Sequence, residues 1–371
     1  MPLPSLRPIL ARFRNIFVAM LLGIVLVVVV LMISLKEPVV APGESASEAI
    51  AHGQDPQSSD ADSDAAAVPR IAFSTEELLG TADAATANSL VFSLQPGGPP
   101  ALLAWSSAGV QIYANGFTPV VAPALAGFEN VRDVSAADFN NDGSADLCVI
   151  DAHGATLLAN RNGRFETLGS GFHFKGRYVQ ALWLDEDHDG SLDLILLGAR
   201  PLALHNRGAA GFAPRPKAIP FVAGTALAGV VLRRLSDQKA VDFVVSDRDR
   251  AGVLYRDRLD GTYTAQRFPE LPAGAHQLRA DDFTGDGVLD LAFLAGGNAV
   301  LLENLGSTWR IRKTVPAAGG FLFADFTNLA VRDWLAGGVL LAGDDANFSQ
   351  SREMATASAT SPAPSCWAGP A

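Results

Sequence analysis

Cysteine is scarce in this sequence, because Cys148 and Cys366 are the only two among 371 residues and lie far apart. No disulfide framework and no paired-cysteine metal site can therefore form. Positive charge is also in short supply, since 28 basic residues face 39 acidic ones and the formal net charge is −11. A nucleic-acid-binding surface is therefore a poor first interpretation. Disorder over most of the chain is excluded by a hydrophobic content of 49%.

Long apolar runs are absent except near the N-terminus, where residues 16–35 contain no charged side chain. Such a run is long enough to cross a bilayer as a helix. Arg7, Arg12 and Arg14 precede it, so residues 1–15 are expected to stay cytoplasmic and the rest of the chain to be periplasmic or extracellular. A cleavable signal peptide is the alternative, but its apolar region is usually shorter than this one. We therefore predict a single-pass membrane protein with an uncleaved anchor.

Two segments lack large apolar side chains at any regular spacing. Residues 36–70 contain seven acidic residues and only two basic ones, a lysine and an arginine. Residues 351–371 are similarly low in complexity. Neither segment offers enough apolar surface to offset the entropy cost of ordering. We expect a disordered acidic linker at 36–70 and a low-complexity tail at 351–371.

Between these segments lies an internal repeat. Three stretches align without gaps: DFNNDGSADLCVI from Asp138, DEDHDGSLDLILL from Asp185 and DFTGDGVLDLAFL from Asp282. Weaker copies begin at Ser93, Arg234 and Asp325. The equivalent ninth positions are separated by 45, 47, 49, 48 and 43 residues, which is a nearly constant spacing. A repeat of this length indicates a solenoid, a propeller or another array.

Each copy reads as four short strands. In the copy from Asp138, apolar runs precede and follow the acidic stretch, and Asn162-Gly163 marks a hairpin between two further runs. Amphipathic helical spacing is absent from residues 90–350. The sequence therefore predicts an all-β fold at residues 71–350, a β-propeller of about six four-stranded blades. Residues 71–74 could add a closing strand and residues 75–79 a short helical turn.

The acidic stretches share the pattern D-x-[DNT]-x-D-G-x-x-D. Positions one, three, five and nine supply side-chain oxygens, position six is glycine, and position seven can supply a backbone carbonyl. The candidate metal ligands are Asp138, Asn140, Asp142, Ser144 and Asp146; Asp185, Asp187, Asp189, Ser191 and Asp193; and Asp282, Thr284, Asp286, Val288 and Asp290. Together the three loops hold eleven acidic residues and no basic one.

Calcium suits such loops, because it takes six to eight oxygen ligands in a flexible geometry. Magnesium is the second choice, and zinc is disfavoured without cysteine or histidine at ligand spacing. An EF-hand is excluded because position twelve is apolar: Val149, Leu196 or Phe293. Simple acidic turns remain an alternative, but they require no particular residue at position nine. We predict about three Ca²⁺ ions. The copy from Arg234 should bind none, since Arg234 and Lys239 occupy ligand and glycine positions.

With these motifs the chain resembles the FG-GAP/VCBS repeats of integrin-α-like β-propellers and is similar to bacterial relatives of cartilage acidic protein. The resemblance covers roughly residues 89–350. It implies calcium bound at one face of the propeller and partner recognition by loops at the other. The implied function is a membrane-anchored, extracytoplasmic propeller that binds a protein or glycan partner, as an adhesin or envelope scaffold.

A propeller enzyme acting on a polysaccharide or another periplasmic substrate is the alternative. The sequence contains no GxSxG, HExxH, P-loop or dinucleotide-binding motif in its proper context. The six histidines are scattered, and His188, inside the second acidic loop, is expected to point outward. Trp105, Trp183 and Trp334 are expected in the core, as is Cys148. We therefore expect no catalytic residues and no cofactor other than calcium.

Overall fold

The computed structural model describes residues 88–353 except 116–117, 234–239, 318–319, 325–331, 338, 344–347 and 349–350. The predicted cytoplasmic segment, anchor, linker, closing strand and helical turn all lie outside the described residues, as does the chain after residue 353. Within the described part, no helix has the length and hydrophobicity needed to span a bilayer.

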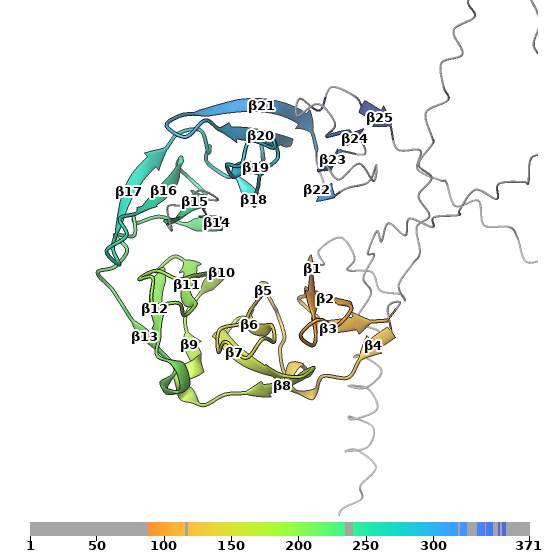
Figure 1. The fold of residues 1–371 in the computed structure, drawn as a ribbon, viewed down its shortest axis with the longest axis vertical. Coiled ribbons are helices and arrows are strands. Elements are labelled where there is room, and N and C mark those ends of the chain that lie inside the picture. Colours follow the sequence, from red (N-terminus) through yellow and green to blue (C-terminus); the bar gives the residue numbers. More distant parts are fainter. Residues whose placement is uncertain are drawn as a thin grey trace, which may run out of the picture. The chain divides into compact units, whose positions relative to one another are not determined.

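Six antiparallel sheets follow one another along the chain and are arranged around a ring (Figure 1). The first three blades contain β1 (Asn88–Ser93), β2 (Pro100–Ser106), β3 (Gly109–Ala114) and β4 (Thr118–Val120); β5 (Asp133–Ala137), β6 (Asp146–Ile150), β7 (Gly154–Arg161) and β8 (Arg164–Thr167); and β10 (Tyr178–Leu184), β11 (Asp193–Gly198), β12 (Leu202–Asn206) and β13 (Phe212–Pro214).

The next three blades contain β14 (Ala226–Arg233), β15 (Val241–Asp247), β16 (Gly252–Asp257) and β17 (Tyr263–Phe268); β18 (His276–Asp281), β19 (Asp290–Ala295), β20 (Asn298–Asn304) and β21 (Trp309–Pro316); and β22 (Phe321–Ala324), β23 (Asp333–Ala336), β24 (Val339–Leu341) and β25 (Ser351–Glu353). A further strand, β9 (His173–Lys175), pairs with β7. Short 3-10 helices span Pro123–Leu125, Ser170–Phe172 and Gly208–Ala210.

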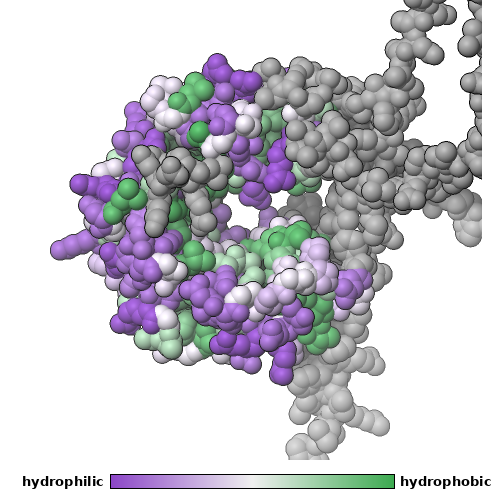
Figure 2. All heavy atoms as spheres, in the orientation of Figure 1, coloured by the Kyte–Doolittle hydropathy of each residue, from purple (hydrophilic) through white to green (hydrophobic). Residues whose placement is uncertain are grey.

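The predicted all-β propeller of six four-stranded blades is confirmed. Within each blade, consecutive strands pair as antiparallel hairpins, and the first strand of each blade lies toward the centre of the ring (Figure 1). The weakest copy, from Ser93, also forms a full blade. The last strand, β25, falls in the segment that the sequence assigned to the tail. Figure 2 shows a mainly hydrophilic face around a central opening.

The second strand of a blade is buried on both faces. In β6 the side chains of Leu147 and Val149 pack with the core of blade 1, whereas Cys148 and Ile150 pack with that of blade 3. Alternation follows from the strand period of two, which sends successive side chains to opposite faces. The continuous apolar run DLCVI is therefore the pattern of a strand between two neighbouring blades.

The same alternation continues around the ring. The cluster between blades 3 and 4 includes Ile195 and Phe243, and the cluster between blades 4 and 5 includes Val244 and Leu291. Trp334 is fully buried against blade 5, and Trp105 and Cys148 are also buried, as predicted. Trp183 is half-buried and stacks on Phe139, with ring centroids 5.8 Å apart. Each fully buried large apolar side chain contributes about 1.5–3 kcal/mol.

Candidate functional site

The three complete acidic loops connect the first and second strands of blades 2, 3 and 5. Their glycines at position six, Gly143, Gly190 and Gly287, have φ values of 85°, 90° and 82°. Left-handed backbone of this kind carries a steric penalty for other residues, so glycine is required at this turn. The sequence pattern therefore predicted the loop geometry correctly.

The aspartate at position one organises the loop backbone in the same way in each blade. In blade 2, Asp138 accepts hydrogen bonds from the backbone N–H groups of Asp142 (3.0 Å) and Gly143 (2.8 Å). Asp185 and Asp282 accept the equivalent pairs in blades 3 and 5. The aspartate at position five accepts the N–H of position seven in all three loops. The loops therefore share one conformation.

The aspartate at position nine is buried and ties two strands together. Asp146 accepts the N–H of Asn160, at the end of the third strand, at 2.7 Å, and the N–H of Phe139 at 3.2 Å. Asp193 and Asp290 make the corresponding bonds in blades 3 and 5. These aspartates thus have a structural role besides the predicted metal ligation.

Position nine keeps this structural role where the rest of the loop is degenerate. Asp242 of blade 4 accepts the N–H of Asp257, and Asp333 of blade 6 accepts the N–H of Gly343, both at 2.9 Å. In blade 4, Arg256 also lies 2.8 Å from the Asp242 carboxylate. A guanidinium therefore neutralises this carboxylate. Residues 234–239 and 325–331, the remainder of these two loops, lie outside the described part.

An asparagine at the end of the third strand is a second signature that the sequence analysis missed. Asn160 and Asn206 are buried and donate from Nδ2 across the blade boundary, to the carbonyls of Leu94 (3.0 Å) and Phe139 (2.8 Å). Asn304 occupies the same place in blade 5. These asparagines follow the ninth-position aspartate by 13 or 14 residues, a spacing that was readable in the repeat.

Burial makes the ionised form of the ninth-position carboxylates costly. It raises the pKa of Asp146 and of Asp290 to about 6, and it raises the pKa of Asp193 above its ordinary value. The negative charges of Asp142 and Asp138 raise the pKa of Asp146 further. Because the folded protein disfavours the ionised form, a cation in the loop would stabilise it.

Blade 3 brings its predicted ligands closest together. One oxygen each from Asp185, Asp187 and Asp193 lie within 4.8 Å of one another. Asp187 Oδ1 is buried and has no hydrogen-bond partner among the described residues. This orphaned oxygen fits a cation ligand. Elsewhere in the described part of the chain, no group of three acidic, histidine or cysteine side chains lies this close.

The prediction that His188 points outward is wrong. Its Nε2 lies 3.0 Å from Asp257 Oδ2, at the end of β16 in blade 4, and the histidine side chain is largely covered. Position four has a left-handed φ in all three loops, so the polar group that distinguishes blade 3 is the Asp257 carboxylate of the neighbouring blade, which the imidazole faces. Sequence reasoning had no means of seeing a partner that belongs to another repeat.

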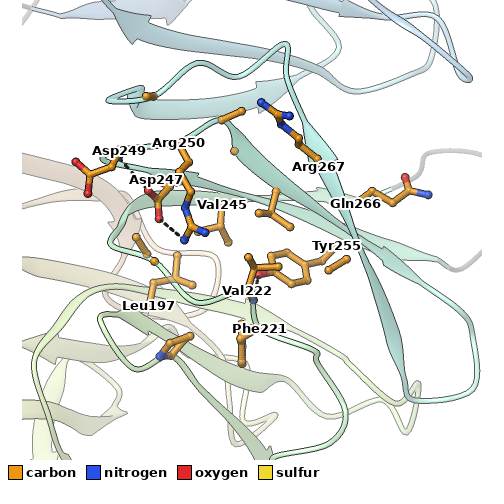
Figure 3. Close-up of a pocket in the computed structure, with 18 of the residues that line it drawn as sticks. Leu197, Phe221, Val222, Val245, Asp247, Asp249, Arg250, Tyr255, Gln266 and Arg267 are labelled. Carbon is orange, nitrogen blue, oxygen red and sulfur yellow. Dashed lines mark hydrogen bonds and ion pairs between the residues drawn. The ribbon is translucent and has the colours of Figure 1, made fainter.

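A pocket of about 490 Å³ lies between blades 3 and 4 (Figure 3). Leu197, at the end of β11, and Val245, near the end of β15, help form it, together with the segment before β14. The acidic loop of blade 3 lies at the beginning of β11, so the pocket is reached from the opposite end of this strand. No residue of the pocket was singled out from the sequence, because loops and strands of two blades assemble it.

The pocket combines an apolar wall with charged groups. Phe221 packs edge-on against Tyr255 at 5.8 Å, and the Tyr255 hydroxyl accepts the N–H of Val222 at 3.1 Å. Asp247 is held by the N–H of Thr225 at 2.7 Å, and Arg250 Nη2 lies 3.5 Å from it. Arg267 is also exposed at the pocket. Apolar surface and placed charges together are typical of small-ligand sites.

A carboxylate on an inner strand gives a pH prediction. Burial raises the pKa of Asp133 from 3.8 to about 6, although the Ala181 N–H and the charge of Arg279 oppose the shift. The folded protein therefore binds this proton more tightly than the unfolded chain. The contribution of Asp133 to stability should be greatest below about pH 4 and should decline as the pH rises through about 6.

We expect Asp133→Asn to remove this decline, because the amide oxygen can still accept the Ala181 N–H. Denaturant unfolding at pH 4.5 and 7.5, in saturating calcium, measures the free-energy difference between variant and native protein. The native protein should lose stability relative to the variant at the higher pH. If the difference in unfolding free energy between the variant and the native protein did not change with pH, the raised pKa of Asp133 would be contradicted.

Comparison with known proteins agrees with the repeat pattern and the fold. Residues 138–196 match the family model of the FG-GAP-like repeat, and this stretch spans the loops of blades 2 and 3. The prediction of a six-bladed β-propeller is confirmed, and residues 138–196 are similar to the FG-GAP-like repeat, as predicted. The likeness to bacterial relatives of cartilage acidic protein stays a prediction. Among curated proteins, none matches the sequence.

Solved structures match this chain at low sequence identity. A lectin of Agrocybe aegerita, described as recognising non-reducing terminal N-acetylglucosamine, matches with a TM-score of 0.54 and 17% identity, over 72% of this chain and 79% of the lectin. Sqt1 of Saccharomyces cerevisiae matches with a TM-score of 0.45 and 12% identity, over 70% of each chain. At 17% identity the likeness to the lectin concerns the fold alone.

Proposed function

We propose that the protein is a membrane-anchored, extracytoplasmic propeller that calcium stabilises and that binds a protein or glycan partner through the pocket between blades 3 and 4. The pocket is the observation that carries the recognition role. The uncharged run at residues 16–35, with arginines before it, supports the anchor and its orientation.

Calcium binding is supported by the ligand chemistry of the loops. In blades 2, 3 and 5 the ion would be held by the side chains at positions one, three, five and nine and by the backbone carbonyl at position seven. Bound calcium would neutralise carboxylates that burial makes costly to ionise. The guanidinium of Arg256 beside Asp242 supports the proposal that blade 4 holds no ion.

Partner binding is supported by the size and chemistry of the pocket. Its volume falls within the roughly 300–1,000 Å³ of small-ligand sites. Val222 is 43% exposed and offers apolar surface, while Arg250 and Arg267 offer hydrogen-bond donors for hydroxyl, acetamido or carboxylate groups. A saccharide presents both kinds of surface. The glycan recognition described for the Agrocybe aegerita lectin shows such a ligand on a protein of similar fold.

The test uses the full-length chain in detergent with calcium, on an array of neutral, N-acetylated and acidic oligosaccharides. Val222→Trp should fill the pocket and weaken binding of any retained saccharide by about tenfold or more, which is about 1.4 kcal/mol. Val121→Trp is the matched control, since Val121 is 89% exposed and is not among the pocket residues.

Equal binding by the two tryptophan variants would contradict the pocket assignment. For a protein partner, a photo-crosslinking residue at position 222 should capture it from envelope fractions, and the same residue at position 121 should not. Failure of both the saccharide array and the crosslinking would overturn the proposed recognition role.

A further inference from the structure

Blade 3 departs from its sister blades at two equivalent positions. Position two of the acidic loop is Phe139 in blade 2 and Phe283 in blade 5, but Glu186 in blade 3. The residue before the strand-ending asparagine is Ala159 in blade 2 and Glu303 in blade 5, but His205 in blade 3. A carboxylate and an imidazole thus enter the same blade, and the fold places them close together.

Glu186 is buried where its counterparts are buried phenylalanines. The residue is only 1% exposed. Its Oε1 lies 3.0 Å from Arg215 Nη1, but neither carboxylate oxygen has a hydrogen-bond partner among the described residues. A buried carboxylate is costly unless both its charge and its lone pairs are compensated. Arg215 also contacts Asp187 Oδ2 at 2.6 Å, so one guanidinium is shared between two carboxylates.

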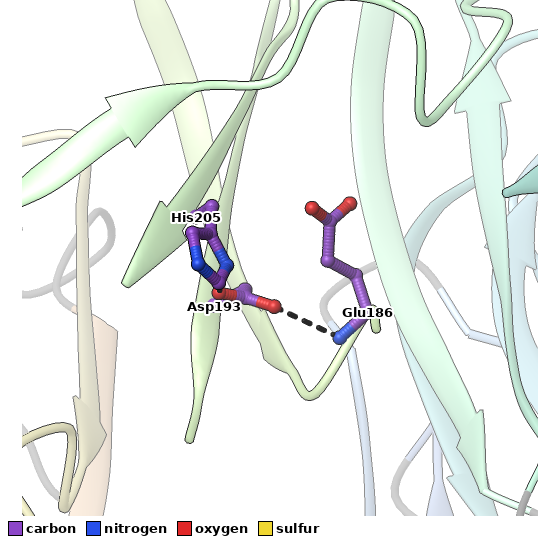
Figure 4. A group of neighbouring side chains, drawn as sticks. All are labelled: Glu186, Asp193 and His205. Carbon is purple, nitrogen blue, oxygen red and sulfur yellow. Dashed lines mark hydrogen bonds and ion pairs between the residues drawn. The ribbon is translucent and has the colours of Figure 1, made fainter. Parts of the chain in front are cut away.

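His205 Nδ1 faces carboxylate oxygens but has no hydrogen-bond partner among the described residues. Its Nδ1 lies 3.2 Å from Asp193 Oδ1 and 3.4 Å from Asp187 Oδ2. In Figure 4 the imidazole lies beside the Asp193 carboxylate, with Glu186 across from them. One ligand atom each from Glu186, Asp193 and His205 lie within 4.8 Å of one another. If Nδ1 carries its lone pair, a cation between it and these oxygens would stabilise the arrangement.

We propose that Glu186, Asp193 and His205 form a binding site for a divalent transition metal, with Zn²⁺ as the favoured ion. One imidazole and two carboxylates are ligands that zinc accepts, and three protein ligands leave a fourth position open. Calcium prefers an all-oxygen shell, so the imidazole argues against it here. The metal would engage one carboxylate oxygen of Glu186 and His205 Nδ1, and Arg215 could keep its contact with the Glu186 carboxylate.

This site differs from the calcium-type ligand set of the same loop. The calcium-type set uses Asp185, Asp187, Asp189 and Asp193, so Asp193 belongs to both sets, and His205 also lies within 4.8 Å of Asp187 and Asp189. Two of the three zinc ligands, Glu186 and His205, are outside the D-x-[DNT]-x-D-G-x-x-D pattern. The zinc proposal therefore does not depend on the proposed calcium binding.

The test is calorimetric titration of Zn²⁺ into the full-length chain in detergent, with and without millimolar calcium. We expect about one equivalent of Zn²⁺ that Glu186→Phe and His205→Ala each abolish or weaken by about 10–100-fold. Both variants restore residues that sister blades carry, so folding should survive, which the melting curve without zinc checks. His276→Ala, which removes an exposed imidazole in blade 5, is the matched control and should leave the titration unchanged.

Cobalt substitution gives an independent readout. Co²⁺ in a tetrahedral site with a nitrogen ligand should show visible absorption bands that the two blade 3 variants lose. Zinc binding that survives in both variants would overturn the proposal. The proposal would also be overturned if the native protein bound no zinc and NMR showed that His205 takes up a proton. A proton would then supply the positive charge between the carboxylates. Loss of calcium binding with retained zinc binding would contradict only the calcium proposal.

Discussion

Full-length protein stripped of calcium by a chelator is expected to melt about 15 °C or more below the calcium-loaded protein. A ligand that binds only the native state stabilises it by about 2.7 kcal/mol per site at a hundredfold excess over Kd. Three loops share this effect, and each is joined directly to the buried second strand of its blade. Differential scanning calorimetry in detergent, with chelator and then with calcium restored, measures the shift.

Single loop variants assign the ions to blades. Asp142→Ala, Asp189→Ala and Asp286→Ala should each remove one calcium by elemental analysis, whereas Asp242→Ala should remove none, because Arg256 already neutralises that carboxylate. Purified native protein should contain about three calcium ions. An unchanged melting temperature in chelator, or calcium-free native protein, would show that these loops are acidic turns held by hydrogen bonds alone.

Asp290→Ala should destabilise the propeller even without calcium. The Asp290 carboxylate is fully buried and accepts hydrogen bonds from the N–H groups of Phe283, Thr284 and Asn304 and from the Thr284 hydroxyl. Each buried donor left unpaired costs about 1–3 kcal/mol, so we expect a loss of about 3–5 kcal/mol. Urea unfolding in the presence of chelator measures this loss apart from any effect of the ion.

Asp286→Ala in the same loop is the control for this measurement. Asp286 is exposed and accepts one N–H, from Val288 at 2.9 Å. In chelator its removal should cost less than about 1.5 kcal/mol. Equal losses for the two variants would contradict the structural role that we assign to position nine.

The repeat made the fold predictable in unusual detail. A ninth-position aspartate recurring every 43 to 49 residues set the frame of five blades, and the apolar run after the ninth position marked the second strand in each blade. Position-six glycines such as Gly143 marked the loop turn. These features are local in sequence, so hydrophobic period and turn chemistry were sufficient to identify them.

Features that join different repeats could not be predicted in the same way. His188 meets Asp257 of the next blade, and the pocket draws on Leu197, Phe221 and Arg267, which are separated by tens of residues. The strand-ending asparagine Asn160 was visible at constant spacing, but its importance depends on a carbonyl of the preceding blade. Pairings of this kind are set by how blades pack, which the pattern within one repeat does not contain.

The alternating second strand also decides what can unfold on its own. Leu147 and Val149 belong to one interface and Cys148 and Ile150 to the next, so no apolar cluster belongs to a single blade. Removing one blade would remove half of the apolar contacts of each neighbouring blade. The second strand of each neighbour would then expose one apolar face to solvent. The cooperative units of this protein are therefore the interfaces between blades. A destabilising substitution in one blade should reduce hydrogen-exchange protection in the blades on either side.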